Sequence, residues 1–232
     1  MLRIAELFTS IQGEGIWLGV PSVFVRVSGC NLRCTWCDTP YASWEPEGPM
    51  RSVDELVAEI IANPVQHVVI TGGEPLLFDE VGELSSGLRQ AGKVITFETA
   101  GTVYRDWPCD LMSISPKLSN STPPPETPND WAARHDETRQ NLQPLADLVT
   151  THNCQLKFVV DPDGKGDDLA EIDAILSRLP DIPQGRILLM AEGTSADVLH
   201  DRMRKLVPIA MTKGWRLTPR MQIDLFGDTK GT

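Results

Sequence analysis

Short apolar runs alternate with stretches of helical periodicity along most of this chain. Six runs are rich in branched and apolar residues and are bounded by turn residues, which predicts β-strands. They are residues 21–29, 66–73, 93–101, 110–117, 154–162 and 186–193. Because polar positions are few within these runs, we expect both faces of most of the strands to be buried.

Helical periodicity fills several of the gaps between these strands. Apolar positions recur at helical spacing in residues 52–62, 81–92, 167–179 and 195–214. Ser52 and Glu55 have the spacing of a capping box, which marks the start of the first helix. The alternation implies right-handed crossovers and a mainly parallel α/β sheet. About six strands favour an open or incomplete (β/α) barrel over the closed eight-stranded form.

The length of the chain predicts one domain. Its 232 residues suffice for one sizeable core, and an apolar content of 41% is ordinary for a globular domain. We therefore expect a single domain over residues 1–232. Prolines at 123, 124, 125 and 128 exclude helix and central strand near residues 117–130, which predicts a loop or insertion too short to separate two domains.

Charge and hydropathy narrow the range of partners. The chain has 21 basic and 32 acidic residues, for a formal net charge of -11. This charge opposes binding to a phosphate backbone, so nucleic acid is not expected as a partner. No apolar run approaches the roughly 20 residues that cross a bilayer, and the amino terminus lacks the pattern of a signal peptide. We expect a cytoplasmic protein without a membrane partner.

Three of the five cysteines, Cys30, Cys34 and Cys37, lie within eight residues of one another. In a reducing cytosol such a trio more often binds metal than forms disulfides. Thiolates suit zinc or an iron-sulfur cluster, and these spacings let one loop wrap its sulfurs around a single centre. A structural zinc site normally has a fourth protein ligand, which a distant residue could supply. Spacing alone therefore leaves both metals open.

Two motifs resemble the radical S-adenosylmethionine superfamily. One is the spacing C-x-x-x-C-x-x-C with Trp36 before the last cysteine, and the other is TGGEP at residues 71–75, although paired glycines also mark ordinary turns. The resemblance implies that the cysteines bind three irons of a 4Fe-4S cluster and that S-adenosylmethionine binds the fourth. One electron then cleaves that cofactor to a radical, which removes a hydrogen from substrate.

A longer match extends this resemblance. The residues FTSIQGEG at 8–15, Gly19 and the run VFVRVSGCNLRCTWCDT resemble the 7-carboxy-7-deazaguanine synthase family. The similarity covers about residues 4 to 117 and about 154 to 231. It implies ring contraction of 6-carboxy-5,6,7,8-tetrahydropterin to 7-carboxy-7-deazaguanine with loss of ammonia, in queuosine-type deazapurine biosynthesis. It further implies Mg²⁺, a homodimer, and an electron donor such as flavodoxin or ferredoxin.

Carried over position by position, the resemblance implies three groups of site residues and no acid-base catalyst. The substrate-binding residues would be Ile11, Gln12, Gly13, Glu14, Arg26, Glu98, Thr99, Lys117, Gln222 and Thr232. The cofactor-binding residues would be Trp36, Cys37, Asp38, Gly72, Gly73, Glu74, Gly101, Ser115, Gln155, Leu156, Lys157, Leu189, Met190, Ala191 and Glu192. The metal ligands would be Cys30, Cys34 and Cys37 for the cluster and Thr39 for Mg²⁺.

Some positions depart from the family pattern. Relatives usually carry Glu at position 155, a Gln-Pro pair at 189–190 and His at 222, where this chain has Gln, Leu-Met and Gln. Arginine suits a substrate carboxylate, but Arg26 could also form a surface ion pair. Likewise, Thr39 could cap the turn before Pro40 through its hydroxyl.

Two other functions compete with ring contraction. An activase that installs a glycyl radical on a partner protein shares the cysteine spacing, although IQGEG and DTP favour a small-molecule substrate. A zinc-stabilised binding module would be colourless, would hold one metal ion and would not cleave S-adenosylmethionine. Anaerobic reconstitution followed by an absorption spectrum separates these classes.

Overall fold

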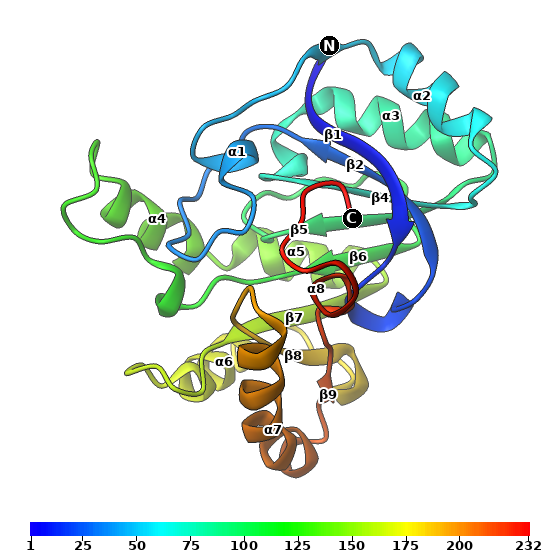
Figure 1. Cartoon of the computed structure of the whole chain (residues 1–232). Helices are drawn as coiled ribbons and strands as arrows, with labels where there is room; N and C mark the ends of the chain where they lie inside the picture. The colour runs from blue at the N-terminus through cyan, green and yellow to red at the C-terminus, as the bar shows by residue number, and fades with distance from the viewer.

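A curved sheet of nine strands organises the computed structural model, which describes residues 1–232 (Figure 1). The strands are β1 (Leu2–Ile11), β2 (Pro21–Val27), β3 (Met50–Arg51), β4 (His67–Gly72), β5 (Val94–Thr99), β6 (Leu111–Ile114), β7 (Cys154–Val160), β8 (Ile187–Ala191) and β9 (Arg216–Leu217). Their order in the sheet is β3-β1-β2-β4-β5-β6-β7-β8-β9. The two outermost strands, β3 and β9, are not neighbours, so the barrel is open.

The six predicted strands are β2, β4, β5, β6, β7 and β8, and adjacent members of this set pair in parallel. The prediction of a mainly parallel, incomplete barrel is therefore confirmed. The sheet has three further strands that we did not predict. Strands β3 and β9 span two residues each, and β1 pairs antiparallel with β2 and β3.

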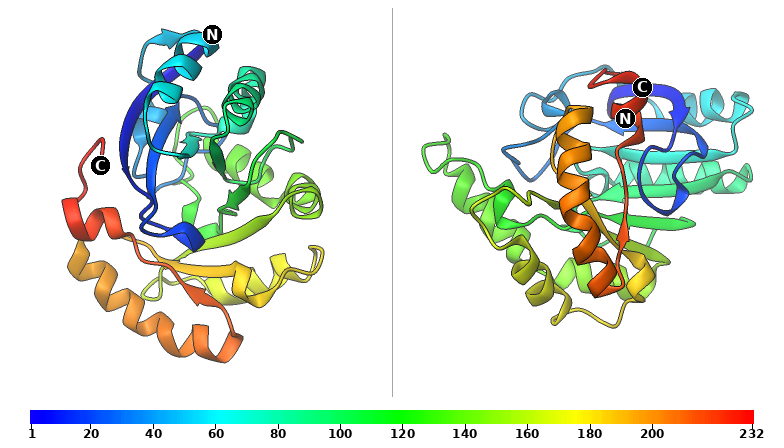
Figure 2. Two further views of the ribbon diagram at one scale, coloured as in Figure 1. Left: turned by 90° about the vertical axis from the view of Figure 1, so that its right-hand side faces the viewer. Right: turned by 60° about the horizontal axis from the view of Figure 1, so that its bottom comes forward.

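Helices connect the strands and cover the outer face of the sheet (Figure 2). The α-helices are α1 (Pro40–Ser43), α2 (Val53–Ala62), α3 (Asp79–Gln90), α4 (Trp131–Gln140), α5 (Gln143–Thr151), α6 (Asp168–Leu176), α7 (Ala196–Lys213) and α8 (Met221–Phe226). Short 3-10 helices are η1 (Gly15–Trp17), η2 (Pro75–Leu77), η3 (Ser119–Ser121) and η4 (Gln184–Arg186). None of these helices is both long and apolar enough to cross a membrane.

The predicted capping box is present at the start of α2. The Ser52 hydroxyl accepts from the Glu55 N–H at 3.2 Å, and the Glu55 carboxylate accepts from the Ser52 N–H at 3.1 Å. Helices α3, α6 and α7 overlap the other three predicted helices. Helices α4 and α5 were not predicted. Residues 117–130 contain η3 and otherwise only turns and irregular chain.

The main core lies between the sheet and the outer helices. Parallel strands supply fully buried side chains such as Val25, Ile70, Phe97 and Phe158, which pack with apolar residues of the helices. This packing fixes the strands from one side. The carboxyl ends of the strands are left to line a cavity on the inner side of the sheet.

The segment after β9 crosses the open side of the barrel and approaches β1 (Figure 2). At the crossing, the Met221 N–H donates to the Gly13 carbonyl at 3.0 Å. A Cβ on Gly13 would lie 1.8 Å from the Gln222 Oε1 and 3.0 Å from the Gln222 backbone nitrogen, so a larger residue would displace the Gln222 side chain. Residues near the two ends of the chain thus meet at the wall of the cavity.

Candidate active site

One cavity collects most of the predicted site residues at the carboxyl ends of the parallel strands. The predicted residues that line it are Ile11, Gln12, Gly13, Glu14, Arg26, Cys30, Cys34, Trp36, Cys37, Asp38, Thr39, Gly72, Gly73, Glu98, Thr99, Ser115, Lys117, Lys157, Met190, Ala191, Glu192, Gln222 and Thr232. Parallel α/β sheets commonly bind ligands at this edge, where the loops after successive strands meet.

The three clustered cysteines occupy the loop between β2 and α1, which we call the cluster loop (residues 28–39). All three thiols are free, and each faces the cavity. Burial raises the pKa of Cys30 to about 12 and that of Cys34 to about 11. Iron must displace protons from such thiols, so its binding stabilises the thiolate form. The Leu32 N–H already points at the Cys30 sulfur, at 3.4 Å.

This donor set fits an iron-sulfur cluster. No group of three or more His, Cys, Asp or Glu side chains is placed to hold a single metal ion. A 4Fe-4S cluster accepts one thiolate at each iron, so its cysteines need not converge on one point. Three free thiols on one loop at the cavity wall can therefore bind three irons and leave the fourth open to another ligand.

The glycine pair at the end of β4 packs against the end of β2 and the start of the cluster loop. Gly72 has a φ of +147°, and a Cβ there would lie 2.1 Å from the Val27 carbonyl oxygen. A Cβ on Gly73 would lie 2.2 Å from the carbonyl oxygen of Gly29. Any larger residue would separate the two loops, so these glycines let the GGEP turn and the cluster loop meet at the cavity wall.

Glu74, the acid of the same motif, is fully buried and does not line the cavity. Its carboxylate accepts hydrogen bonds from the Thr99 hydroxyl at 2.7 Å, from the Ala100 N–H at 2.8 Å and from the Leu76 N–H at 3.1 Å. Burial raises the pKa of Glu74 despite these donors. The side chain therefore shapes the turn and the end of β5, while the backbone of the glycines lines the cavity.

Arg26 projects from β2 into the cavity and forms an ion pair on its wall. Its Nε donates to Glu6 of β1 at 2.6 Å, and the Tyr41 hydroxyl donates to the same carboxylate oxygen at 2.8 Å. Only 18% of the Arg26 side chain is exposed, so this is not a surface ion pair. The Nη groups have no hydrogen-bond partner in the protein, and they can bind an anion that enters the cavity.

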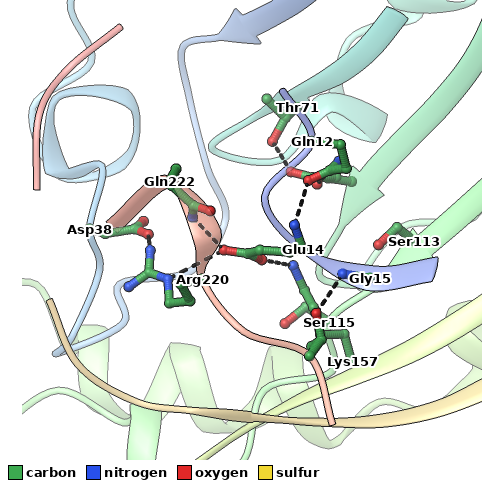
Figure 3. A network of polar contacts seen from close by, with 12 residues as sticks. Gln12, Glu14, Gly15, Asp38, Thr71, Ser113, Ser115, Lys157, Arg220 and Gln222 are labelled. Atoms are coloured by element: carbon green, nitrogen blue, oxygen red, sulfur yellow. Dashed lines mark hydrogen bonds and ion pairs between the residues drawn. The ribbon is translucent and has the colours of Figure 1, made fainter. Parts of the chain in front are cut away.

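Glu14 is the centre of a network that joins opposite walls (Figure 3). It forms ion pairs with Lys157 of β7 and with Arg220 of the C-terminal segment, and it accepts from the Gln222 amide at 2.8 Å. Burial opposes ionisation, but the two cations and these hydrogen bonds outweigh it and lower the pKa of Glu14 from 4.5 to about 2. Glu14 is therefore a carboxylate at neutral pH.

Gln12 connects this network to Glu98. Its Nε2 donates to Glu98 at 3.0 Å, and its Oε1 accepts from the Glu14 N–H at 3.0 Å. The other Glu98 oxygen accepts from the Thr71 hydroxyl at 3.0 Å. Glu98 thus lies on the cavity wall without a direct cationic partner, and its remaining lone pairs can accept hydrogen bonds from a ligand.

Thr39 follows the cluster cysteines and precedes α1. It occupies the N-cap position of that helix, but its side chain makes no capping hydrogen bond. The hydroxyl lies 3.8 Å from the Cys37 sulfur and faces the cavity. The alternative role of Thr39, capping the turn before Pro40 through its hydroxyl, is therefore absent. The hydroxyl oxygen is available to a ligand.

Five predicted site residues do not line the cavity. Besides Glu74, these are Gly101, Gln155, Leu156 and Leu189. Leu156 and Leu189 are fully buried in the main core, because alternate residues of a strand face opposite sides of the sheet. Gln155 is buried against η1, where it accepts from the Ile16 N–H at 2.9 Å and donates to the Ser113 hydroxyl.

Sequence reasoning missed several residues that line the cavity or support it. Arg220 is the most connected of them, since it pairs with Glu14 and Asp38 and donates to the Gly193 carbonyl at 2.7 Å. Thr71 and the Glu6–Tyr41 pair were also missed. Only contacts between distant segments reveal these roles. For Glu6, however, the alternation of side chains along β1 could have indicated which face of the sheet it lies on.

Comparison with known proteins agrees with this geometry. Residues 24–142 match the family model described as the radical SAM superfamily. The chain is 45% identical to 7-carboxy-7-deazaguanine synthase of Halobacterium salinarum, over 100% of this chain and 93% of that protein. It is 44% identical to the same enzyme of Rhodopirellula baltica, over 100% of this chain and 89% of the relative.

The chain belongs to the 7-carboxy-7-deazaguanine synthase family. Among solved structures, QueE from Escherichia coli superposes with a TM-score of 0.69 at 25% identity, covering 95% of this chain and 94% of that one. TYW1 with a lysine-pyruvate adduct bound has a TM-score of 0.57 at 15% identity, over 81% of this chain and 72% of that chain, which is a likeness of fold. The open barrel of this synthase family member is therefore the radical SAM fold, whose enzymes use a 4Fe-4S cluster and S-adenosylmethionine.

Proposed function

We propose that this chain converts 6-carboxy-5,6,7,8-tetrahydropterin to 7-carboxy-7-deazaguanine with loss of ammonia, in deazapurine biosynthesis. The observation that carries the proposal is the composition of the cavity. One wall has three free thiols on a single loop, and another has a buried arginine whose terminal nitrogens are free. When bound, the cluster and S-adenosylmethionine supply the radical that removes a hydrogen from substrate.

The protein's own side chains would bind and orient the pterin. Arg26 would pair with the substrate carboxylate, since the Glu6 pair leaves its Nη groups free. Glu98 and Glu14 would accept hydrogen bonds from the N–H groups of the pterin ring, with Gln12 holding both in position. The hydroxyl of Thr39 would ligate Mg²⁺, a hard cation that often binds through few protein oxygens plus substrate and water.

Trp36, Asp38 and the backbone of Gly72 and Gly73 would bind S-adenosylmethionine beside the cluster. Their place on the cavity wall next to the cysteines supports this assignment. A homodimer and an electron donor of the flavodoxin or ferredoxin type complete the proposal. A cytoplasmic setting suits five free cysteines, because reducing compartments keep thiols unpaired.

Anaerobic reconstitution with iron and sulfide tests the metal assignment. The wild type should bind about four irons and show broad brown absorption, and Cys34→Ala should abolish it. The reduced protein with S-adenosylmethionine, Mg²⁺ and the carboxypterin should then release deazapurine and ammonia in equal amounts. One tightly held zinc without iron would overturn the assignment. A cluster that activates a glycyl-radical partner but leaves the pterin unchanged would instead favour an activase.

A further inference from the structure

Residues 118–136 enclose one side of the cluster loop. This segment comprises η3, the proline-rich stretch and the start of α4, and Figure 1 shows α4 beside the chain that leads from β2 to α1. The Thr35 N–H donates to the Ser121 carbonyl at 2.9 Å. The Trp36 Nε1 donates to the carbonyl and side-chain oxygens of Asn120 at 3.1 and 3.2 Å. The residues after Cys34 are therefore held by this segment.

His135 holds the residue before Cys34. It is fully buried, and its Nδ1 accepts from the Arg33 N–H at 3.1 Å. The Ser121 hydroxyl has one hydrogen and donates it to the Leu118 carbonyl at 2.6 Å, so it accepts from the His135 Nε2–H at 2.9 Å. The two ring nitrogens thus have opposite roles, which only a neutral imidazole allows. Burial lowers the pKa of His135 to about 4, in agreement.

Asn120 ties the same contact to the frame of the sheet. Its amide nitrogen donates to the Val159 carbonyl of β7 at 3.1 Å and to Asp168 of α6 at 2.9 Å. Both donor hydrogens therefore face rigid elements, while the acceptors face Trp36. On the outer side, the Arg33 guanidinium lies over the Trp131 ring, 4.0 Å from its centroid. The segment thus contacts the cluster loop through both backbone and side chains.

We propose that residues 118–136 form a brace that holds the cluster loop ready to bind iron, with His135 and Asn120 as positioning residues. The inference rests on the assignment of the cluster to the three cysteines. A free loop loses conformational entropy when it wraps a cluster, and a loop that is already ordered avoids most of that loss. The brace therefore speeds cluster assembly and slows cluster loss in oxygen.

His135→Ala tests the brace, and His67→Ala is its matched control. His67 is also buried, and both of its ring nitrogens are also hydrogen-bonded, to the Ser22 hydroxyl at 2.7 Å and the Thr96 hydroxyl at 2.8 Å, but it lies at the amino ends of the strands. Reconstituted clusters should bleach in air about fivefold faster or more in His135→Ala, the factor for a lost hydrogen bond of about 1 kcal/mol. His67→Ala should keep the wild-type rate. His135→Gln, which retains an acceptor and a donor, should restore most of the lifetime.

Equal bleaching rates in wild type and His135→Ala would overturn the brace, and so would equal acceleration in both histidine variants. Circular dichroism of the apo-proteins reports whether each variant folds. If His135→Ala does not fold, the bleaching rate of Asn120→Ala and hydrogen exchange of the wild-type apo-protein test the brace instead. The amides of Arg33 and Thr35 should exchange slowly, and exchange at the rate of an unfolded chain contradicts the proposal. A wild type that binds no cluster would instead refute the metal assignment.

Discussion

Arg26 shows how a single buried side chain can select a substrate by its charge. Its Nε is held by Glu6, so the guanidinium is oriented before any ligand enters. Removal of this cation would leave the substrate carboxylate unpaired in a partly desolvated cavity. The proposed role thus predicts a loss of binding that depends on the carboxylate of the ligand.

We expect Arg26→Ala to weaken binding of 6-carboxytetrahydropterin by on the order of 2 to 5 kcal/mol. Binding of tetrahydropterin without the carboxyl group should change much less. Arg26→Lys should recover only part of the loss, because an ammonium group lacks the planar fork. Calorimetric titration with both ligands measures the difference, and equal losses for the two would remove Arg26 from carboxylate recognition.

The Thr39 hydroxyl makes no capping hydrogen bond to the helix that follows it. If it ligates Mg²⁺, removal of divalent ions should slow turnover of wild type and added Mg²⁺ should restore it. Thr39→Ala should respond only weakly to Mg²⁺, while Thr39→Ser should behave like wild type. Initial rates across a Mg²⁺ titration test this, and the same stimulation in Thr39→Ala would exclude the residue from the metal site.

Glu14 links the protonation of the site to the stability of the fold. Its pKa is about 2 in the folded protein and 4.5 in a free side chain. The ionised carboxylate therefore contributes fully to the unfolding free energy above pH 4.5, and this contribution is lost as the pH falls toward 2. Between pH 5 and 3, apo wild type should lose on the order of 2 kcal/mol more unfolding free energy than Glu14→Gln. Urea titrations of both proteins at pH 5 and at pH 3 measure the two losses of unfolding free energy. Equal losses in wild type and Glu14→Gln would contradict this prediction.

At the scale of elements, regular patterns predicted the regular parts of the fold. The apolar runs of the parallel strands and the Ser52 capping box are local signals, and both were found where the sequence indicated. Strand β1 was missed because we read its end only as a substrate motif. Helix α4 was missed because its apolar residues form no stripe, and the side chain that it buries fully is His135.

The candidate site likewise has residues that a local motif predicts and residues that only long-range contacts reveal. The three clustered cysteines, the paired glycines and residues 11–14 belong to contiguous motifs, so they could be predicted, and they are gathered at one cavity. Arg220 lies 206 positions from its partner Glu14, within a segment that has no periodicity. A contact of that kind depends on the topology of the whole chain, and no local pattern encodes it.

At the scale of the molecule, Arg220 joins three distant segments around the cavity. It contacts Glu14 after β1, Asp38 in the cluster loop and Gly193 after β8. We expect Arg220→Ala to raise the KM for the pterin about tenfold or more, equivalent to about 1.4 kcal/mol, because Glu14 loses one cation and Asp38 is released.

Steady-state kinetics at saturating S-adenosylmethionine separate KM from kcat. Arg220→Lys should recover part of the affinity, since it retains the charge. Arg105→Ala is the control, because Arg105 pairs with Asp79 at 3.0 Å outside the cavity. A KM unchanged by Arg220→Ala, or raised equally by Arg105→Ala, would show that this contact does not position the substrate.

The brace is also synthesised later than the cluster loop that it holds. The cluster loop is synthesised about 100 residues before His135, and at roughly 5 to 20 residues per second the ribosome needs on the order of 5 to 20 s to cover that distance. During this interval three thiols are exposed without the segment that orders them. The wall that includes Arg220 is completed later still. If the brace orders the loop as proposed, iron loading is fastest once residues 118–136 have folded against it, and until then the three thiols depend on a reducing environment.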